Sequence, residues 1–229
     1  MIPKIIHYCW FGNKEKNSKI LHNIDTWKKF FPQFKIIEWN EKNTNLRENE
    51  YVENAYKQKK WAFVSDFVRL KVLFVYGGIY FDTDVEVVKT FPSDILNLSA
   101  FTGIESDSLL VSPGLVLASE PKNAVIEELL KTYSNSNFDK GHYTINMRVT
   151  DYLKQDGFKM VDKLQQIAGF TIFPSEVFCA YDPISRKVSV TTDTLSIHHY
   201  DASWVPWYLK LRFKLGTYKR RFNYYLSKR

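Results

Sequence analysis

The chain contains little cysteine and no long apolar run. Its two cysteines, Cys9 and Cys179, are too few for a disulfide framework or a four-thiolate zinc site, so we interpret them as core thiols in a reducing compartment. No apolar run approaches the length that spans a bilayer. The first residues lack the basic flank and apolar core of a secretion signal. The sequence therefore predicts a cytoplasmic protein.

Two common phosphate-binding loops are also missing. Neither the Gly-x-x-x-x-Gly-Lys-Ser/Thr pattern nor the Gly-x-Gly-x-x-Gly pattern occurs in the 229 residues, so a bound phosphate would need another counter-charge. There are no internal repeats and no Gly/Ser-rich or Pro-rich linker. We therefore expect a single domain over residues 1–204, followed by a distinct tail over residues 205–229.

The net charge of +7 comes from an excess of basic residues in that tail. Residues 205–229 contain eight basic and no acidic side chains, and the rest of the chain has 24 basic against 25 acidic residues. Aromatic and aliphatic residues alternate with the basic ones, which is typical of a segment that binds anionic lipid headgroups. Nucleic-acid binding is the alternative, and the near-neutral body disfavours it. The sequence thus predicts peripheral association with the inner face of the plasma membrane.

The first forty residues predict a parallel sheet. A β-branched run at Ile2–Cys9 is followed by a helical pattern that Ser18 can cap and that stops at Pro32, and then by a strand at Phe34–Trp39. Strand, helix and strand in this order form a βαβ unit with a right-handed crossover. The fold class is therefore α/β, with a Rossmann-like, mostly parallel sheet flanked by helices. Ligands of such sheets gather at the carboxyl ends of the strands, where Trp10 lies.

The later elements are less regular. A polar, exposed helix is expected at Tyr51–Lys60, and a buried helical face at Ala62–Tyr76 ends at Gly77. Asp66 and Arg69 are neighbours on that second helix, where the ordinary interpretation is a surface ion pair. Their place just upstream of the strand with Asp82 and Asp84 favours a functional role instead. The remaining predicted elements are a continuation of the sheet at Val85–Val88, a strand at Leu115–Leu117, helices at Pro121–Tyr133 and His142–Leu153, and strands at Phe170–Phe173 and Leu195–His198.

The most informative stretch runs from Val75 to Val85 and contains Asp82-Thr83-Asp84. Side chains alternate along an extended segment, so the two carboxylates point to the same side and offer hard oxygen ligands to Mg²⁺ or Mn²⁺. His198 and His199 alternate in the same way, so at most one of them faces such an ion. His7 lies inside the first strand and is interpreted as a buried, hydrogen-bonded histidine.

Three ordered motifs resemble glycosyltransferase family 32. They are Ile2-Pro-Lys-Ile-Ile-His-Tyr-Cys-Trp10, Ala62-Phe-Val-Ser-Asp66-Phe-Val-Arg69 and Gly77-Gly-Ile-Tyr-Phe-Asp82-Thr-Asp84. The family includes yeast-type initiating mannosyltransferases, bacterial capsule and lipopolysaccharide sugar transferases and, more distantly, clostridial toxin glucosyltransferase domains. The resemblance covers the first ninety residues closely and the segment from His199 to Trp204 loosely. It implies a single-domain GT-A fold.

The resemblance also implies roles for individual residues. Asp84 is the principal ligand of Mn²⁺ or Mg²⁺, Asp82 binds the ion through water or holds sugar hydroxyls, and His199 is a further ligand. Trp10 stacks on the donor base, while Asp66 and Arg69 contact the donor sugar and ribose. Asp82, Asp84, Asp66 and Arg69 form the catalytic set, and the donor-binding set comprises Ile6, Trp10, Asp66, Arg69, Tyr80, Asp82, Thr83, Ser203 and Trp204.

The function implied is metal-dependent transfer of a hexose from a nucleotide-sugar, with retention at the anomeric carbon. UDP-galactose, UDP-glucose or UDP-N-acetylgalactosamine is the favoured donor, and a lipid-linked or surface-polysaccharide oligosaccharide, of capsule or lipopolysaccharide type, is the acceptor. A GDP-mannose-dependent mannosyltransferase is the main alternative. A nucleotide-sugar hydrolase and a basic nucleic-acid-binding protein are less favoured. Same-face attack and double displacement both remain open.

Overall fold

The computed structural model describes residues 1–134, 138, 143–182 and 187–201. Ser203, Trp204 and the basic tail lie outside the described residues, and so does the expected boundary after residue 204. The helices are α1 (Ser18–Phe30), α2 (Glu50–Lys57), α3 (Trp61–Tyr76), α4 (Ser93–Leu96), α5 (Ala124–Ser134), α6 (Ile145–Gln155) and α7 (Ser175–Phe178). The strands are β1 (Ile5–Cys9), β2 (Lys35–Trp39), β3 (Gly78–Tyr80), β4 (Val85–Val87), β5 (Ala100–Gly103), β6 (Leu117–Ser119), β7 (Gln165–Ile167), β8 (Phe170–Phe173), β9 (Tyr181–Asp182), β10 (Lys187–Val188) and β11 (Ser196–His198).

A seven-stranded sheet of order β2-β1-β3-β6-β5-β8-β7 forms the centre of the fold. The strands β2, β1, β3, β5 and β8 run in one direction, and β6 and β7 run against them. The predicted βαβ unit is confirmed, because β1 and β2 pair in parallel from Ile5 opposite Lys35 to Cys9 opposite Trp39. The mixed α/β fold with a mostly parallel sheet is therefore present.

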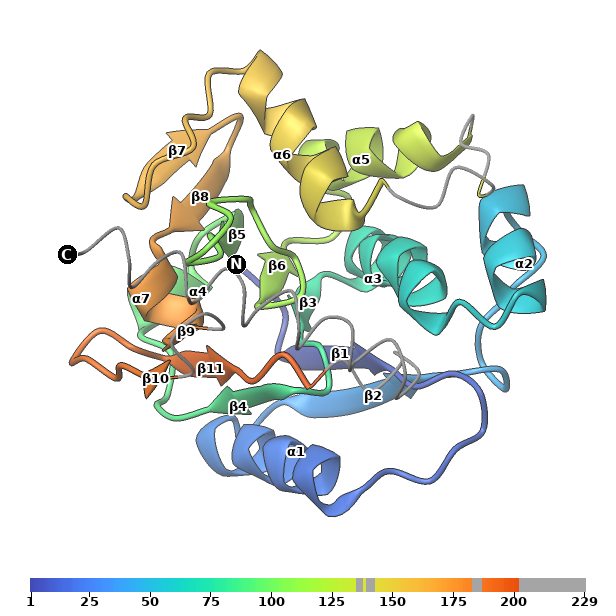
Figure 1. Cartoon of the computed structure of the whole chain (residues 1–229), viewed down its shortest axis with the longest axis horizontal. Helices are drawn as coiled ribbons and strands as arrows, with labels where there is room; N and C mark the ends of the chain where they lie inside the picture. Colours follow the sequence, from blue (N-terminus) through green and yellow to red (C-terminus); the bar gives the residue numbers. More distant parts are fainter. Residues whose placement is uncertain (135–137, 139–142, 183–186, 202–229) are drawn as a thin grey trace, which may run out of the picture.

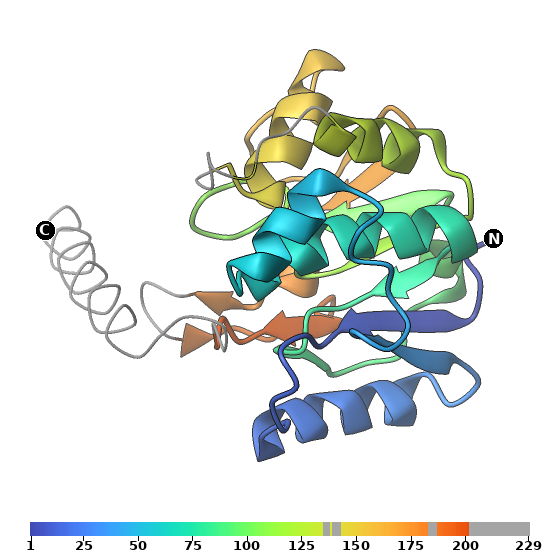
Figure 2. The ribbon, with the colours of Figure 1, turned by 90° about the vertical axis from the view of Figure 1, so that its right-hand side faces the viewer.

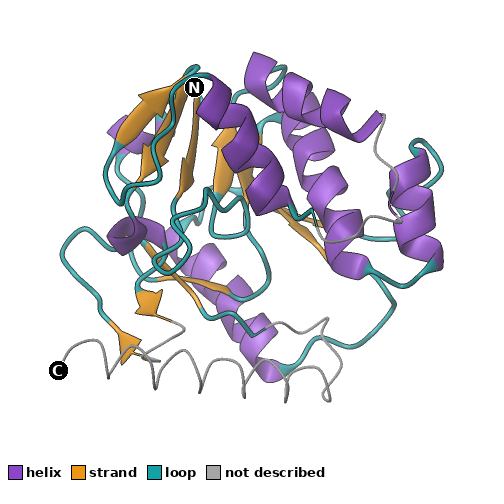
Figure 3. Cartoon of the chain, turned by 45° about the horizontal axis from the view of Figure 1, so that its top comes forward, coloured by secondary structure: helices purple, strands orange, loops and turns teal. Residues whose placement is uncertain are grey.

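Helices cover both faces of this sheet (Figures 1 and 2). Alternation along β1 sends Ile6 and Tyr8 into a core shared with α1, while Cys9 faces a second core shared with α3. Figure 3 shows α2, α3, α5 and α6 gathered to one side of the strands. No helix among the described residues has the length and apolarity needed to cross a membrane.

The strand β4 does not continue the central sheet, contrary to the sequence prediction. It pairs antiparallel with β11 in a separate two-stranded sheet, in which Val85 lies opposite His198 and Glu86 opposite Ile197. The turn from Asp82 to Asp84 redirects the chain after β3, because the Val85 N–H donates to the Asp82 carbonyl oxygen at 3.1 Å. The late segment near His198 is thereby brought next to the two aspartates.

Three local expectations also need correction. The N-cap of α1 is Asn17, whose side chain accepts from the Ile20 N–H at 3.0 Å, and not Ser18. The helix α2 is only partly exposed, since Tyr51 and Val52 are buried. Asp66 and Arg69, for which a surface ion pair is the ordinary interpretation, are 6 % and 3 % exposed. Gly77 ends α3 as predicted, with φ at +62° and its N–H on the Leu73 carbonyl oxygen.

His7 confirms the sequence interpretation of a buried, hydrogen-bonded histidine. The Trp39 indole N–H donates to its Nδ1 at 3.0 Å, and an indole nitrogen cannot accept, so Nδ1 carries no proton. The Nε2–H then donates to the Gly77 carbonyl oxygen at 2.8 Å. Burial disfavours the charged ring and lowers the pKa of His7 to about 4, against the smaller opposing effect of the Gly77 bond. Cys9 and Cys179 are both free and buried, as expected of core thiols.

The lowered pKa of His7 predicts a loss of stability in mild acid. Between pH 6.5 and 4 the unfolded chain binds a proton at this residue and the folded chain does not, so the free energy of unfolding falls as the pH falls. The full shift is worth at most ~3 kcal/mol. Urea unfolding at pH 7 and pH 4.5 should show a smaller pH-dependent loss for His7→Gln than for the wild type. An equal loss in both proteins would contradict this account.

Candidate active site

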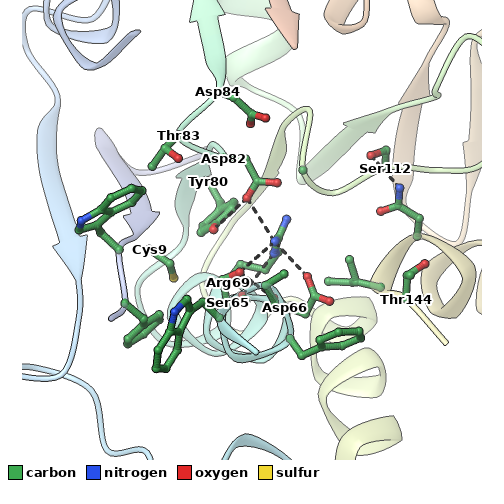
Figure 4. A pocket seen from close by; sticks show the side chains of 18 of the residues that line it. Cys9, Ser65, Asp66, Arg69, Tyr80, Asp82, Thr83, Asp84, Ser112 and Thr144 are labelled. Carbon is green, nitrogen blue, oxygen red and sulfur yellow. Dashed lines mark hydrogen bonds and ion pairs between the residues drawn. The ribbon is translucent and has the colours of Figure 1, made fainter. Parts of the chain in front are cut away.

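A cavity of about 770 Å³ opens where β1 and β3 end. Its walls come from separate parts of the chain: the end of β1, the helix α3, the turn after β3, the segment from Glu105 to Gly114, the start of α6 and the end of β11. Its volume is in the usual range of a small-molecule site. Figure 4 shows Asp66, Arg69, Asp82 and Asp84 projecting toward this space from different elements.

Two carboxylates and one imidazole converge at one corner of the cavity. Asp82, Asp84 and His198 each present a ligand atom, and these atoms lie within 4.8 Å of one another. The Nε2 of His198 is 3.1 Å from Asp84 Oδ1. The sequence assigned this position to His199, and the structure corrects that assignment. His198 shares the inner face of its strand pair with Val85, so the next residue points outward, where its Nε2 lies 2.8 Å from Glu86 Oε2.

The pKa values of Asp82 and Asp84 are shifted in opposite directions at this corner of the cavity. Burial raises the pKa of Asp82, and the nearby Asp84 charge adds to that, against the attraction of the Arg69 guanidinium. Burial also acts to raise the pKa of Asp84. The charge of His198, and hydrogen bonds from His198 and the Asp201 N–H, outweigh burial, so the pKa of Asp84 is lowered. The same carboxylate raises the pKa of His198 although burial opposes this. Asp84 is thus the stronger anion of the pair.

The donor set suits a divalent ion with affinity for both oxygen and nitrogen. Carboxylates suit Mg²⁺ and Mn²⁺, and the imidazole of His198 favours Mn²⁺ of the two. Two buried nitrogen atoms at this site, His198 Nδ1 and Arg69 Nη1, have no hydrogen-bond partner among the described residues. Unpaired buried donors are costly, and they therefore mark a place where a ligand is accommodated.

Arg69 links α3 to the Asp82 turn. Its Nη2 lies 3.0 Å from Asp66 Oδ1 and 3.2 Å from Asp82 Oδ1. Its guanidinium carbon is 4.6 Å from the centre of the Tyr80 ring, and the Tyr80 hydroxyl donates to Asp82 Oδ1 at 3.1 Å (Figure 4). Burial raises the pKa of Asp66 to about 6, although Arg69 and the Ile145 N–H at the start of α6 oppose the rise. One cation therefore positions two carboxylates of the predicted site.

Gly114 is required by the close approach of Asp82. A Cβ added at Gly114 would collide with Asp82 Oδ2, and it would come within 3.6 Å of the unpaired Arg69 Nη1. The Asp82 N–H also donates to the Gly114 carbonyl oxygen at 3.3 Å. The absence of a side chain at this position leaves space for Asp82 and for a ligand of Arg69.

A polar wall faces the aspartates across the cavity. Glu105 Oε1 accepts from Asn146 Nδ2 at 2.9 Å and from Ser112 Oγ at 3.2 Å, and Asn146 Nδ2 also donates to Ser112 Oγ at 3.1 Å. Both amide hydrogens of Asn146 are thereby used, so its oxygen is left as an acceptor for a ligand. Fixed amide and hydroxyl groups of this kind recognise sugar hydroxyls.

The remaining predicted residues lie in different surroundings. Trp10 lines the cavity, with its indole N–H on the Lys14 carbonyl oxygen at 2.6 Å and Lys16 Nζ 5.6 Å from its ring centre. Tyr80 and Thr83 also line the cavity. Ile6 is fully buried in the α1 core, so its side chain does not reach the cavity. Ser203 and Trp204 lie outside the described residues.

Sequence reasoning missed several cavity residues. Glu105, Ser112 and Gly114 come from irregular segments, and Asn146 lies in the first turn of α6, so only the three-dimensional fold brings these residues together. The alternation rule allowed only one of His198 and His199 to face the ion, and the family resemblance implied His199, whereas the structure places His198 there. The register between β11 and β4 decides this choice.

The chain is similar in sequence to glycosyltransferases. Residues 17–102 match the family described as "Glycosyltransferase sugar-binding region containing DXD motif". An uncharacterised glycosyltransferase of Acanthamoeba polyphaga mimivirus is 27% identical over 230 residues, which cover 92% of this chain and 86% of the relative.

Two solved structures have a similar fold. The PaToxG glycosyltransferase has a TM-score of 0.51 and 23% identity over 68% of this chain and 70% of its own. A glycosyltransferase involved in glycosylation of the major capsid of PBCV-1 has a TM-score of 0.52 and 11% identity over 87% of this chain and 95% of its own. The matched family region contains Asp66, Arg69, Asp82 and Asp84, so over this region the chain is similar to glycosyltransferases with a DXD sugar-binding region, and its fold is similar to that of two glycosyltransferases of known structure.

Proposed function

We propose that the chain transfers a hexose from a nucleotide-sugar to a glycan acceptor and that this reaction depends on Mn²⁺ or Mg²⁺. The observation that carries the proposal is the convergence of Asp82, Asp84 and His198 beside the unpaired Arg69 Nη1 in one cavity. A bound divalent ion supplies Lewis-acid charge for the departing diphosphate. UDP-linked galactose, glucose or N-acetylgalactosamine is the favoured donor, and GDP-mannose is the alternative.

The residues of the chain have separate tasks in this proposal. Asp84, the stronger anion, is the principal ligand together with His198, and Asp82 is held by Arg69 and Tyr80 at the second ligand position. Arg69 Nη1 donates to an oxygen of the donor, where it stabilises developing negative charge. Trp10 offers its ring to the base at the rim of the cavity, and the Asn146 oxygen accepts from a sugar hydroxyl across from the metal corner.

Retention of anomeric configuration is proposed from the family resemblance. An oligosaccharide acceptor that is lipid-linked or part of a capsule or lipopolysaccharide is proposed on the same basis. The basic tail supports a location at the membrane, because its eight cationic side chains at residues 205–229 suit anionic lipid headgroups. A cytoplasmic enzyme bound at the inner face of the plasma membrane meets such an acceptor there.

The donor site predicts ligand-dependent stabilisation. In a screen of UDP- and GDP-sugars with Mn²⁺, sugars linked to one of the two bases should raise the melting temperature of the protein. A ligand at 100 times its Kd increases the free energy of unfolding by about 2.7 kcal/mol. Asp84→Asn should lose this shift and should lower turnover by roughly a hundredfold or more. Asp25→Asn, at an exposed position of α1, is the matched control and should behave like the wild type. Flat responses of the wild type to all donors, or full Mn²⁺-dependent turnover by Asp84→Asn, would contradict the proposal.

Gly114→Ala tests the position of Asp82. The added methyl group collides with the Asp82 carboxylate, so we expect kcat/KM and Mn²⁺ affinity to fall by roughly tenfold or more, as for loss of a well-oriented metal-site contact. Gly157→Ala adds a methyl group in open space at a φ of +97°, so it should lower stability and leave the Mn²⁺ dependence of activity unchanged. Kinetics over a Mn²⁺ titration provide the measurement, with circular dichroism to confirm folding. Unchanged Mn²⁺ dependence in Gly114→Ala would show that Asp82 does not need this clearance.

The tail predicts binding to anionic lipid. Full-length protein should float with vesicles that contain phosphatidylserine or phosphatidylglycerol, and a chain that ends at residue 204 should not. Each basic residue near the surface contributes about 1 kcal/mol, so added salt should release the full-length protein. Equal flotation of the two proteins would disprove a role of the tail.

A further inference from the structure

The polar wall of the cavity consists of Glu105, Ser112 and Asn146, and Glu105 is held there at both of its carboxylate oxygens. Its Oε1 accepts from Asn146 Nδ2 at 2.9 Å and from Ser112 Oγ at 3.2 Å. Its Oε2 accepts from Ser108 Oγ at 2.7 Å, and the Ser108 hydroxyl oxygen in turn accepts from the Leu110 N–H at 3.2 Å. Hydrogen bonds from three neutral side chains therefore fix the position of this carboxylate at the cavity.

The loop that carries Glu105 is fastened to α6 by contacts of its backbone. The Glu105 N–H donates to the Leu110 carbonyl oxygen at 2.9 Å, and the Leu109 N–H donates to the Glu105 carbonyl oxygen at 3.1 Å. The Val111 N–H donates at 2.9 Å to Oγ1 of Thr150, a fully buried residue of α6. These contacts do not involve the side chain of Glu105. A conservative change of that side chain therefore leaves the loop and the helix in place.

The first turn of α6 is also tied to the corner of the cavity that holds the two aspartates of the turn at Asp82–Asp84. The Ile145 N–H, directly before Asn146, donates to the carboxylate of Asp66. Asp66 Oδ1 lies 3.0 Å from Arg69 Nη2, and the same nitrogen lies 3.2 Å from Asp82 Oδ1. One chain of contacts thus sets the distance between Asn146 and the place that we propose for the diphosphate.

The chemistry of Glu105 decides which atom of the Asn146 amide is left for a ligand. A carboxylate can only accept, so the amide nitrogen of Asn146 has to point toward Glu105. Its two hydrogens go to Glu105 Oε1 and Ser112 Oγ, and the Ser112 hydroxyl hydrogen goes to Glu105 as well. Asn146 Oδ1 has no hydrogen-bond partner among the described residues. The polar wall therefore presents acceptors to a ligand and has no free hydrogen to offer.

We propose that Glu105 is a positioning residue, which fixes the Asn146 amide with its oxygen toward the donor sugar so that the polar wall recognises one sugar hydroxyl. This inference rests on the proposed function, because it needs a donor sugar between the diphosphate and the polar wall. A hydroxyl supplies the hydrogen that Asn146 Oδ1 lacks, whereas a carboxylate or a keto group at the same ring position supplies none. The polar wall thus selects a neutral, hydroxylated sugar at that position.

Glu105→Gln tests the role of the carboxylate with a side chain of the same size. A glutamine amide can donate to Asn146 Oδ1, which turns the Asn146 amide and removes the free acceptor. The measurement is calorimetric titration with Mn²⁺ and six ligands: UDP, GDP, UDP-glucose, UDP-galactose, UDP-N-acetylgalactosamine and GDP-mannose. Glu105→Gln should weaken binding of the preferred donor by roughly two- to tenfold, the effect of one neutral hydrogen bond. Its affinity for the free nucleotide should stay unchanged, because the nucleotide carries no sugar.

Asp107→Asn is the matched control for the removed charge. Asp107 lies on the same loop, and it is exposed and does not line the cavity. This variant should bind both the free nucleotide and the donor like the wild type. A purely structural effect of Glu105→Gln would weaken both ligands together, so the comparison with the free nucleotide separates positioning from folding.

Donors that lack one hydroxyl identify the group that the polar wall recognises. The probes are the 2-, 3-, 4- and 6-deoxy forms of the preferred donor sugar. One of them should bind the wild type more weakly than the intact donor, and this loss should vanish in Asn146→Ala and shrink in Glu105→Gln. The double variant should weaken donor binding no more than Asn146→Ala alone, because Glu105 acts through Asn146.

Three results would overturn the inference while the proposed function stands. They are donor binding that Glu105→Gln leaves unchanged, an equal loss of affinity for donor and free nucleotide, and deoxy losses of the same size in the wild type and Asn146→Ala. A wild type that binds none of the six ligands in the presence of Mn²⁺ would instead refute the proposed function, and this inference with it.

Discussion

The buried ion pairs of the Arg69 guanidinium are the interaction on which the proposed donor site depends. Arg69 is 3 % exposed, and it pairs at once with Asp66 on its own helix and with Asp82 in the turn after β3. Removing one partner of a buried ion pair typically costs about 3–5 kcal/mol because the other charge remains unpaired. One side chain therefore links α3 to the turn at Asp82–Asp84, and its Nη1, at the cavity, has no hydrogen-bond partner among the described residues.

A second constraint comes from the separation of β4 from the central sheet. Because β4 pairs with β11, the imidazole of His198 reaches Asp84, although the two residues are more than a hundred positions apart in the sequence. The same pairing has two sides, with His198 inward at Asp84 and His199 outward at Glu86. The helix α1 supports this pair through three hydrogen bonds between its side chains and the backbone of β4 and its preceding turn. The late segment thus contacts Asp84 on one side of the strand pair and Glu86 on the other.

Local sequence patterns predicted the features that depend on residues close together in the chain. The βαβ unit, the glycine end of α3 and the convergence of Asp82 and Asp84 follow from periodicity, backbone freedom and side-chain alternation. The separation of β4 from the central sheet, and the position of His198 rather than His199 at Asp84, depend on the pairing of β4 with β11. No local pattern encodes a pairing between strands so far apart in the chain. Glu105 and Asn146 were missed for the same reason, because their wall exists only after α6 has packed against the loop near Ser112.

The central claim is that Asp82, Asp84 and His198 hold the divalent ion of the donor site. Crystals grown with Mn²⁺ and UDP, measured at the manganese absorption edge, test it most directly. The account predicts an anomalous peak within ligand distance of Asp84 and His198, with the diphosphate on its open side. An anomalous peak confined to Glu86 and His199, or ordered UDP bound in the cavity without a peak at Asp84, would contradict it.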